Sequence, residues 1–214
     1  MLIRRIPAWV AETNAYVVAA EPGGQAIVVD APPEPEKVGA VVAELDLAVV
    51  AVLLTHGHVD HTGGAGHLAK ATSAITYVHP DDDFLTLHPM EQLRAIFGMV
   101  PPGEYEVPEG LERLHHGQVL DLAGISLEVR HTPGHTPGHC CFYWAGEGVL
   151  FSGDQLFAGS IGRTDLPGGS LPDLLESMKT RVLDLEDEVT VLPGHGPETT
   201  IGQERRTNPF LQGL

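Results

Sequence analysis

Apolar residues follow two periods along the chain, and these periods predict where strands and helices lie. Short apolar runs typical of strands occur at residues 2–6, 15–20, 25–30, 47–54, 75–78, 119–122, 125–130, 140–144, 149–152 and 188–192, with Leu114 in a further short run. Apolar residues recur every three or four positions at residues 35–45, 66–71, 91–99, 170–185 and 200–206, and this spacing predicts helices. Ser170 is a suitable N-cap for the longest of them.

Each half of the chain shows a run of strands followed by a helix. This rhythm predicts two β-sheets packed face to face with helices outside. Residues 81–110 are the least regular part, with short helices expected near 81–83 and at 91–99. Such an insertion could be a lid over a pocket or a plain loop, and the sequence leaves both open.

Length and composition bound the class of protein. The chain has 214 residues with 43% hydrophobic and 19% charged content, which fits one domain or two tightly packed halves sharing a core. No apolar run approaches the roughly 18 residues of a membrane span, and the N-terminus lacks the apolar region of a signal peptide. The two cysteines are neighbours, Cys140 and Cys141, so no disulfide framework is expected and a cytoplasmic location is the default.

The net charge of −17 disfavours nucleic-acid substrates, because affinity for a phosphate backbone depends on cationic contacts. A small-molecule substrate is therefore expected, with neither nucleic acid nor membrane as a partner. The sequence does not predict an oligomeric state.

Residues 55–61 read Thr-His-Gly-His-Val-Asp-His and follow the apolar strand at 47–54. His56 and His58 point the same way in extended backbone, while Asp60 and His61 follow as the chain bends into a helix. Imidazole and carboxylate groups are suitable ligands for zinc, iron or manganese. Four ligand-type residues within six positions, at the end of a buried strand, predict a metal site better than a plain polar turn.

Three further residues of ligand type follow later strands, each beside a glycine. They are His135 in the run 132–139, Asp154 at the end of Phe-Ser-Gly-Asp, and His195 in Leu-Pro-Gly-His-Gly. Each is weak evidence alone, but together they predict a second set of ligands at strand ends. Of the other histidines, His139 is the nearest to a ligand and could orient one.

The sequence resembles the metallo-β-lactamase superfamily, and within it the glyoxalase-II-like hydrolases. The resemblance rests on Asp30, residues 55–61, His135, Asp154 and His195. It implies an α+β fold of the αββα sandwich type, with two mixed sheets and helices outside, over a single domain of residues 1–214. Asp30 would orient a ligand from a strand end; a turn-capping Asp is the equally open alternative.

The resemblance also implies two divalent metal ions bridged by Asp154. The first ion would be held by His56, His58 and His135, and the second by Asp60, His61 and His195. Zinc is the expected metal, with iron or manganese as alternatives. A metal pair can bind one bridging water and deprotonate it near neutral pH, and Asp60 is placed to orient the resulting hydroxide. The lactamases proper lack this bridging Asp, so β-lactam hydrolysis is not expected.

The substrate is less well defined by the sequence. Arg163 could supply a cation to a glutathione carboxylate, as a similar segment does in glyoxalase II, but Asp165 stands where the family has a tyrosine; a simple Arg163–Asp165 ion pair is the alternative. Only 19 residues follow His195, so the C-terminal helical glutathione-binding domain is not expected. The first choice is a thioesterase acting on S-(2-hydroxyacyl)glutathione or a related small-thiol thioester. The alternative is an Fe(II) persulfide dioxygenase using His56, His135 and Asp154.

Overall fold

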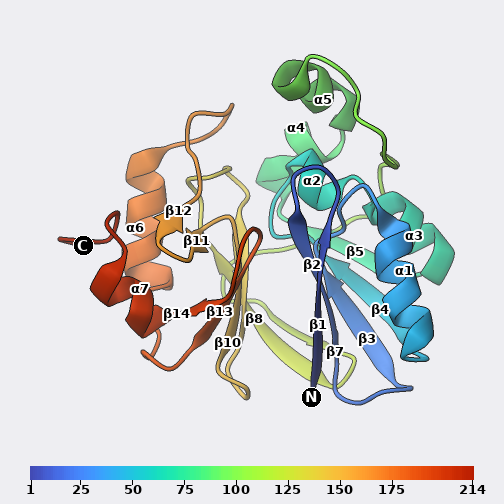
Figure 1. Ribbon diagram of the computed structural model, residues 1–214, viewed down its shortest axis with the longest axis horizontal. Coiled ribbons are helices and arrows are strands. Elements are labelled where there is room, and N and C mark those ends of the chain that lie inside the picture. The colour runs from blue at the N-terminus through green and yellow to red at the C-terminus, as the bar shows by residue number, and fades with distance from the viewer. The chain divides into compact units, whose positions relative to one another are not determined.

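Two mixed six-stranded sheets form the framework of the chain (Figure 1). The structure is a computed structural model that describes residues 1–214, apart from the side chain of Phe97. It divides into two compact units, Met1–Leu114 with Asp121–Ile125, and His115–Leu120 with Ser126–Leu214. The expectation of a single domain stays a prediction, and each unit is described by itself.

The first sheet has the strand order β1-β2-β3-β4-β5-β6. Its strands are β1 Leu2–Ala8, β2 Thr13–Ala19, β3 Gln25–Val29, β4 Ala48–Leu53, β5 Ile75–Val78 and β6 Glu112–Arg113. The first three are antiparallel, and β3, β4, β5 and β6 are parallel. Since parallel strands end at the same edge of a sheet, the residues that follow β3 and β4 come together there.

Helices α1 Pro35–Glu44 and α3 Ala65–Thr72 pack beside this sheet (Figure 1). Their apolar stripes meet β-branched strand residues in one buried cluster that includes Val17, Val28, Val38, Val52 and Leu68. Each such side chain contributes about 1.5–3 kcal/mol when fully buried. This core fixes the strand ends from which the candidate site is built.

The irregular segment predicted at 81–110 contains η1 Pro80–Asp82, α4 Asp83–Thr86 and α5 Pro89–Phe97, so the two short helices are confirmed. Leu93 of α5 is buried in a cluster with Trp9 and Val59, and Val59 begins the single-turn helix α2 Val59–Thr62. Asp82 and Gln92 are also buried. This part of the segment is thus packed onto its own unit, while a lid function stays a prediction.

The second sheet has the strand order β14-β13-β10-β9-β8-β7. Its strands are β7 Val119–Leu122, β8 Ile125–His131, β9 Cys140–Trp144, β10 Val149–Gly153, β13 Thr190–Pro193 and β14 Thr199–Thr200. β10 and β13 are parallel, whereas β10 with β9, β9 with β8 and β13 with β14 are antiparallel. A separate hairpin of β11 Leu156–Phe157 and β12 Ser160–Ile161 follows β10.

Helix α6 Leu171–Arg181 begins at the predicted cap, where the Ser170 hydroxyl accepts a hydrogen bond from the amide of Asp173 at 3.4 Å. The prediction that it extends to residue 185 was wrong. The Leu183 amide donates to the Met178 carbonyl five residues earlier, and this bond ends the helix. Beyond it, the Arg205 guanidinium donates hydrogen bonds to the carbonyl oxygens of Leu183 and Leu185. Val182 and Leu185 still pack in the buried cluster beside α6, although they lie beyond the end of the helix, and this burial explains the apolar pattern that continues to residue 185.

Arg205 belongs to α7 Ile201–Thr207, which is capped by Thr200 as its hydroxyl accepts from the amide of Gln203 at 3.1 Å. α6 and α7 share a buried cluster with Leu150, Val191 and Ile201. No helix in the described chain is both long and apolar enough to cross a membrane.

Cys140 and Cys141 are both free thiols and both buried. Burial raises the pKa of the Cys141 thiol to about 12, so the group stays protonated at neutral pH.

Candidate metal centre

The His-rich turn lies between the end of β4 at Leu53 and the start of α2 at Val59, as the sequence predicted. His56, His58 and His61 are buried, and Asp60 is partly exposed. The Nε2 atom of His56 lies 3.0 Å from Nδ1 of His58, a distance that a shared proton or a shared ion would give. The Nε2 atom of His61 lies 3.4 Å from Oδ2 of Asp60.

Asp30 follows β3 in left-handed backbone, with φ of 58°, and its carboxylate is buried. It accepts hydrogen bonds from the Thr55 amide at 2.8 Å, from the Thr55 hydroxyl at 2.9 Å and from Nδ1 of His61 at 2.8 Å. Since a carboxylate only accepts, Nδ1 of His61 carries the proton and Nε2 presents a lone pair. Asp30 therefore orients His61 and also ties two strand ends together.

Thr13, at the start of β2, donates its hydroxyl to Oδ2 of Asp60 at 2.8 Å. This bond fixes the carboxylate that precedes His61. Nothing in the sequence signalled it, because a threonine 47 positions away carries no motif.

The second unit holds the other three predicted ligands. His135 lies in the turn between β8 and β9 and donates Nδ1–H to the carbonyl oxygen of Arg163 at 2.7 Å. Its Nε2 is thereby left 3.5 Å from Oδ2 of Asp154, the residue after β10. His195, two residues beyond β13, places its own Nε2 3.6 Å from the same oxygen.

His139 positions Asp154. It is fully buried, and its Nε2 accepts the backbone amide of Asp154 at 3.0 Å. Its Nδ1 lies 2.8 Å from the Thr132 hydroxyl, so the proton is on Nδ1 and the ring tautomer is set. His139 thus orients a predicted ligand, a role that the sequence left open, while Thr132 was not predicted.

The donor set fits divalent metal ions. All seven side chains offer imidazole nitrogen or carboxylate oxygen, the ligands that zinc, iron and manganese share. Two atoms each about 2.1 Å from one ion stand roughly 3–3.5 Å apart. The four pairs within the units, at 3.0, 3.4, 3.5 and 3.6 Å, lie close to this spacing. His61 and His135 also make the outer hydrogen bonds that fix ligand rings.

Comparison with known proteins shows to which family the chain belongs. The model of the metallo-beta-lactamase superfamily matches residues 8–195. The chain belongs to this superfamily. The crystal structure of BLEG-1 B3 metallo-beta-lactamase is 36% identical, with a TM-score of 0.91 over 99% of this chain and 100% of that one. The metallo-β-lactamase fold predicted from the sequence is thereby confirmed.

Two further members of the superfamily bear on chemistry. Hydroxyacylglutathione hydrolase GloC of Haemophilus influenzae is 38% identical over 95% of this chain and 90% of its own length. The crystal structure of TTHA1623 in a di-iron-bound form is 41% identical, with a TM-score of 0.86 over 97% of this chain and 100% of that one. Superfamily membership and the clustered donors identify the chain as a metal-dependent hydrolase of this fold.

Arg163 and Asp165 form the ion pair that the sequence offered as an alternative. Nε and Nη2 of Arg163 donate to the two carboxylate oxygens of Asp165 at 2.7 and 2.6 Å, and both side chains are exposed. The guanidinium lowers the pKa of Asp165 to about 2, so the pair stays charged at neutral pH. Binding of a substrate carboxylate by Arg163 stays a prediction, whereas its backbone carbonyl already holds His135.

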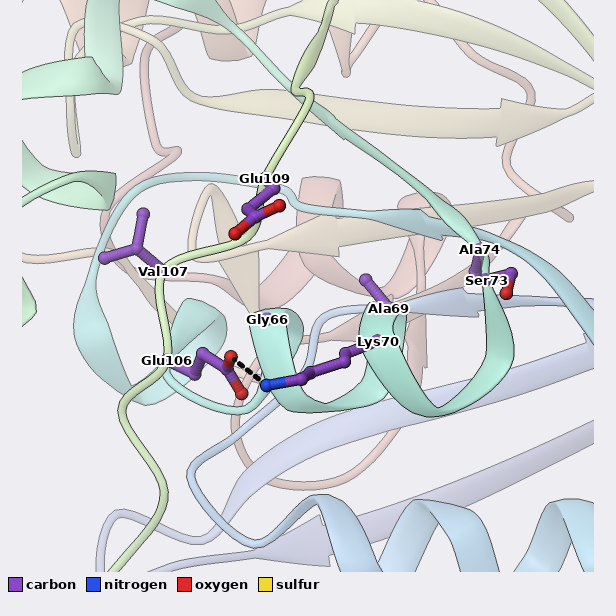
Figure 2. Close-up of a pocket in the computed structure, with 8 residues that line it drawn as sticks. All are labelled: Gly66, Ala69, Lys70, Ser73, Ala74, Glu106, Val107 and Glu109. Atoms are coloured by element: carbon purple, nitrogen blue, oxygen red, sulfur yellow. Dashed lines mark hydrogen bonds and ion pairs between the residues drawn. The ribbon is translucent and has the colours of Figure 1, made fainter.

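A hollow of about 240 Å³ in the first unit lies apart from these ligands. Figure 2 shows it between α3 and residues 106–109; two of the residues that line it, Lys70 and Glu106, form an ion pair with the ammonium 3.2 Å from the carboxylate. The residues drawn there include none of the predicted ligands. It is therefore not the predicted catalytic centre of this superfamily member.

Gly162 tests how tightly the second ligand set is packed. A Cβ there would overlap the carbonyl oxygen of Asp154 and lie 3.1 Å from Nδ1 of His135. We expect Gly162→Ala to displace both predicted ligands and to lower turnover about a hundredfold, the usual cost of misplacing a reacting group by about 1 Å.

The control is Gly39→Ala in α1, where nothing lies within 4 Å of the added Cβ. This variant should gain about 0.5–1 kcal/mol in the free energy of unfolding and keep its activity. Steady-state kinetics and denaturant titration of both proteins give the comparison. Full activity of Gly162→Ala would contradict the close packing.

Proposed function

We propose that the chain is a thioesterase that hydrolyses S-(2-hydroxyacyl)glutathione or a related small-thiol thioester. The reaction takes place at one dinuclear metal centre, to which the His-rich turn at residues 55–61 and the later residues His135, Asp154 and His195 all contribute ligands. The observation that carries this proposal is the position of Asp154. One of its oxygens lies 3.5 Å from His135 and 3.6 Å from His195, two imidazoles that the resemblance assigns to different ions. A carboxylate oxygen between two such nitrogens is what a bridging ligand requires.

Two divalent ions held there would supply a hydroxide near neutral pH and polarise the thioester carbonyl. The chain's own groups keep the ligands ready. Asp30 holds the tautomer of His61, the Arg163 carbonyl holds that of His135, and His139 fixes the backbone of Asp154. Asp60, held by Thr13, is placed to accept a proton or a hydrogen bond from the attacking water.

A thioester suits this arrangement because the leaving thiol has a pKa of only about 8.5 and departs as thiolate with little acid assistance. The relative named hydroxyacylglutathione hydrolase supports this substrate class. The Arg163–Asp165 pair does not add to the support for glutathione, since the cation is already engaged.

One observation favours keeping a second candidate, the Fe(II) persulfide dioxygenase. A relative 41% identical to this chain is described in a di-iron-bound form, which supports iron as a metal for this fold, whereas its two ions match the dinuclear centre rather than a single-iron one. His56, His135 and Asp154 would then serve as the two-histidine, one-carboxylate set of an oxygen-using iron centre.

The test compares three substrates with the purified, metal-loaded protein. We expect thiol release from S-lactoylglutathione without oxygen uptake, and about two metal ions per chain. Oxygen consumption with glutathione persulfide, with one iron per chain, would instead establish the dioxygenase. A β-lactam is the third substrate because BLEG-1 is named a metallo-beta-lactamase. Cleavage of the β-lactam alone would overturn the proposed thioesterase.

A further inference from the structure

The backbone of the His-rich turn is only partly paired with regular secondary structure: the Leu54 amide donates to the Tyr77 carbonyl of β5, and the His58 carbonyl accepts the amides of His61 and Thr62 in α2. Residues 54–58 fall between β4 and α2, and yet they are buried. Buried amides and carbonyls need hydrogen-bond partners, since an unsatisfied one costs about 1–3 kcal/mol. For Gly57 and Val59 these partners are side chains from a distant part of the first unit.

Asp82 and Gln92 supply them. Oδ2 of Asp82 accepts the amide of Gly57 at 2.7 Å, and Oε1 of Gln92 accepts the amide of Val59 at 3.1 Å. Nε2 of Gln92 donates to the Gly57 carbonyl at 3.0 Å and to the Leu85 carbonyl at 2.8 Å. Both polar groups of the residue between His56 and His58 are thus held by these two side chains.

The orientation of the Gln92 amide follows from these bonds. Its nitrogen faces two carbonyls and its oxygen faces an amide, so the reversed amide would oppose every partner. Space is equally restricted, because a Cβ on Gly57 would lie 2.8 Å from Cβ of Leu85 and 2.9 Å from the Asp82 carbonyl oxygen. The turn is packed directly against η1 and α4.

From these contacts we propose that Asp82 and Gln92 are positioning residues that set the spacing of His56 and His58 for the metal. The Gly57 peptide links the two histidines, so its rotation would change the 3.0 Å separation of their ring nitrogens. In the segment at residues 81–110, for which the sequence left a lid open, Asp82 and Gln92 would thus hold the backbone of the His-rich turn in place. The inference rests on the proposed function in one respect, that His56 and His58 bind metal.

The test is metal titration of the apoprotein with zinc against a chromogenic chelator, with no substrate present. Outer hydrogen bonds of this kind contribute about 10–100-fold to metal affinity. We expect Asp82→Ala to bind one zinc ion 10–100-fold more weakly. Asp82→Asn keeps an oxygen for the Gly57 amide and should stay within about threefold of wild type.

Gln92→Glu gives an independent measurement if Asp82→Ala does not fold. It keeps the acceptor for Val59 but sets a carboxylate against two carbonyls, so we expect the same 10–100-fold loss at one site. The matched control is Gln203→Glu on α7, an exposed side chain whose amide donates to the Thr207 hydroxyl and which should bind zinc as wild type does. Circular dichroism of each apoprotein reports folding.

Wild-type zinc affinity in a folded Asp82→Ala or Gln92→Glu variant would overturn the positioning role and leave only a structural one. An equal loss in Asp82→Asn and Asp82→Ala would overturn the hydrogen-bond account, because charge alone would then matter. His58→Ala separates the two proposals. If that variant keeps both zinc ions at full affinity, the metal assignment itself fails, independently of Asp82 and Gln92.

Discussion

Asp154→Ala is expected to lose metal and nearly all thioesterase turnover. The side chain lies beside both His135 and His195, so its removal leaves the two imidazoles with no common carboxylate. Loss of an interaction worth several kcal/mol in the transition state corresponds to about a thousandfold in kcat/KM. Metal content should fall from about two ions per chain to one or none, measured by elemental analysis after gel filtration.

The control for Asp154→Ala is Asp121→Ala, which removes an exposed carboxylate from β7. It should keep two ions and full activity. Circular dichroism of the variant separates loss of metal from loss of fold. The substitution leaves the backbone amide of residue 154 in place, so we expect His139 to accept it as in the wild-type chain. Wild-type metal content with wild-type turnover in Asp154→Ala would exclude the bridging role.

Asp30→Asn is expected to weaken metal binding through the tautomer of His61. If the side-chain oxygen of the variant accepts the Thr55 amide, the new side-chain nitrogen faces the protonated Nδ1 of His61, and two donors oppose each other. Moving the imidazole proton to Nε2 relieves the clash but removes the lone pair that a metal needs. We expect about 10–100-fold weaker binding of one ion and a parallel fall in kcat.

The matched control for Asp30→Asn is Asp46→Asn. Asp46 also has left-handed backbone, with φ of 53°, but its side chain is exposed, so the control reproduces the backbone demand without the histidine. Zinc titration of both apoproteins measures the effect. Equal zinc affinity in Asp30→Asn and Asp46→Asn would show that Asp30 does not act on metal binding through His61. Its role would then be limited to the geometry of the turn.

The parts of the fold that the sequence predicted are those with local causes. β4 is a run of β-branched and small apolar residues, and α6 has a capping serine and an apolar stripe. The strands β11, β12 and β14 were not predicted as such, and β6 was predicted only as a short run at the adjacent Leu114, since two residues each are too few to show a period. Their existence depends on partners supplied by the folded chain.

The same division applies to the candidate site. Histidines and aspartates at the ends of β3, β4, β10 and β13 were found because strand ends of an α/β sheet gather polar side chains at one edge. Thr13, Asp82 and Gln92 were missed because each contacts the His-rich turn across 25 to 47 positions. A hydrogen bond at that separation leaves no pattern in a single sequence.

The same reasoning explains Arg163. A cation shortly after Asp154 suggested substrate binding, and its exposed partner two positions later was equally visible. Only the folded geometry shows that the guanidinium engages both oxygens of Asp165 while its backbone carbonyl holds His135. The identity of the Arg163 side chain suggested substrate binding, whereas the contact with His135 is made by the backbone carbonyl of Arg163.

Anomalous X-ray scattering from crystals of the zinc-loaded protein tests the central claim most directly. The proposed centre predicts two zinc peaks, one bound by His56, His58 and His135 and the other by Asp60, His61 and His195, with Asp154 bound to both. A single peak would contradict it. So would two peaks of which one contacts only residues 56–61 and the other only His135, Asp154 and His195.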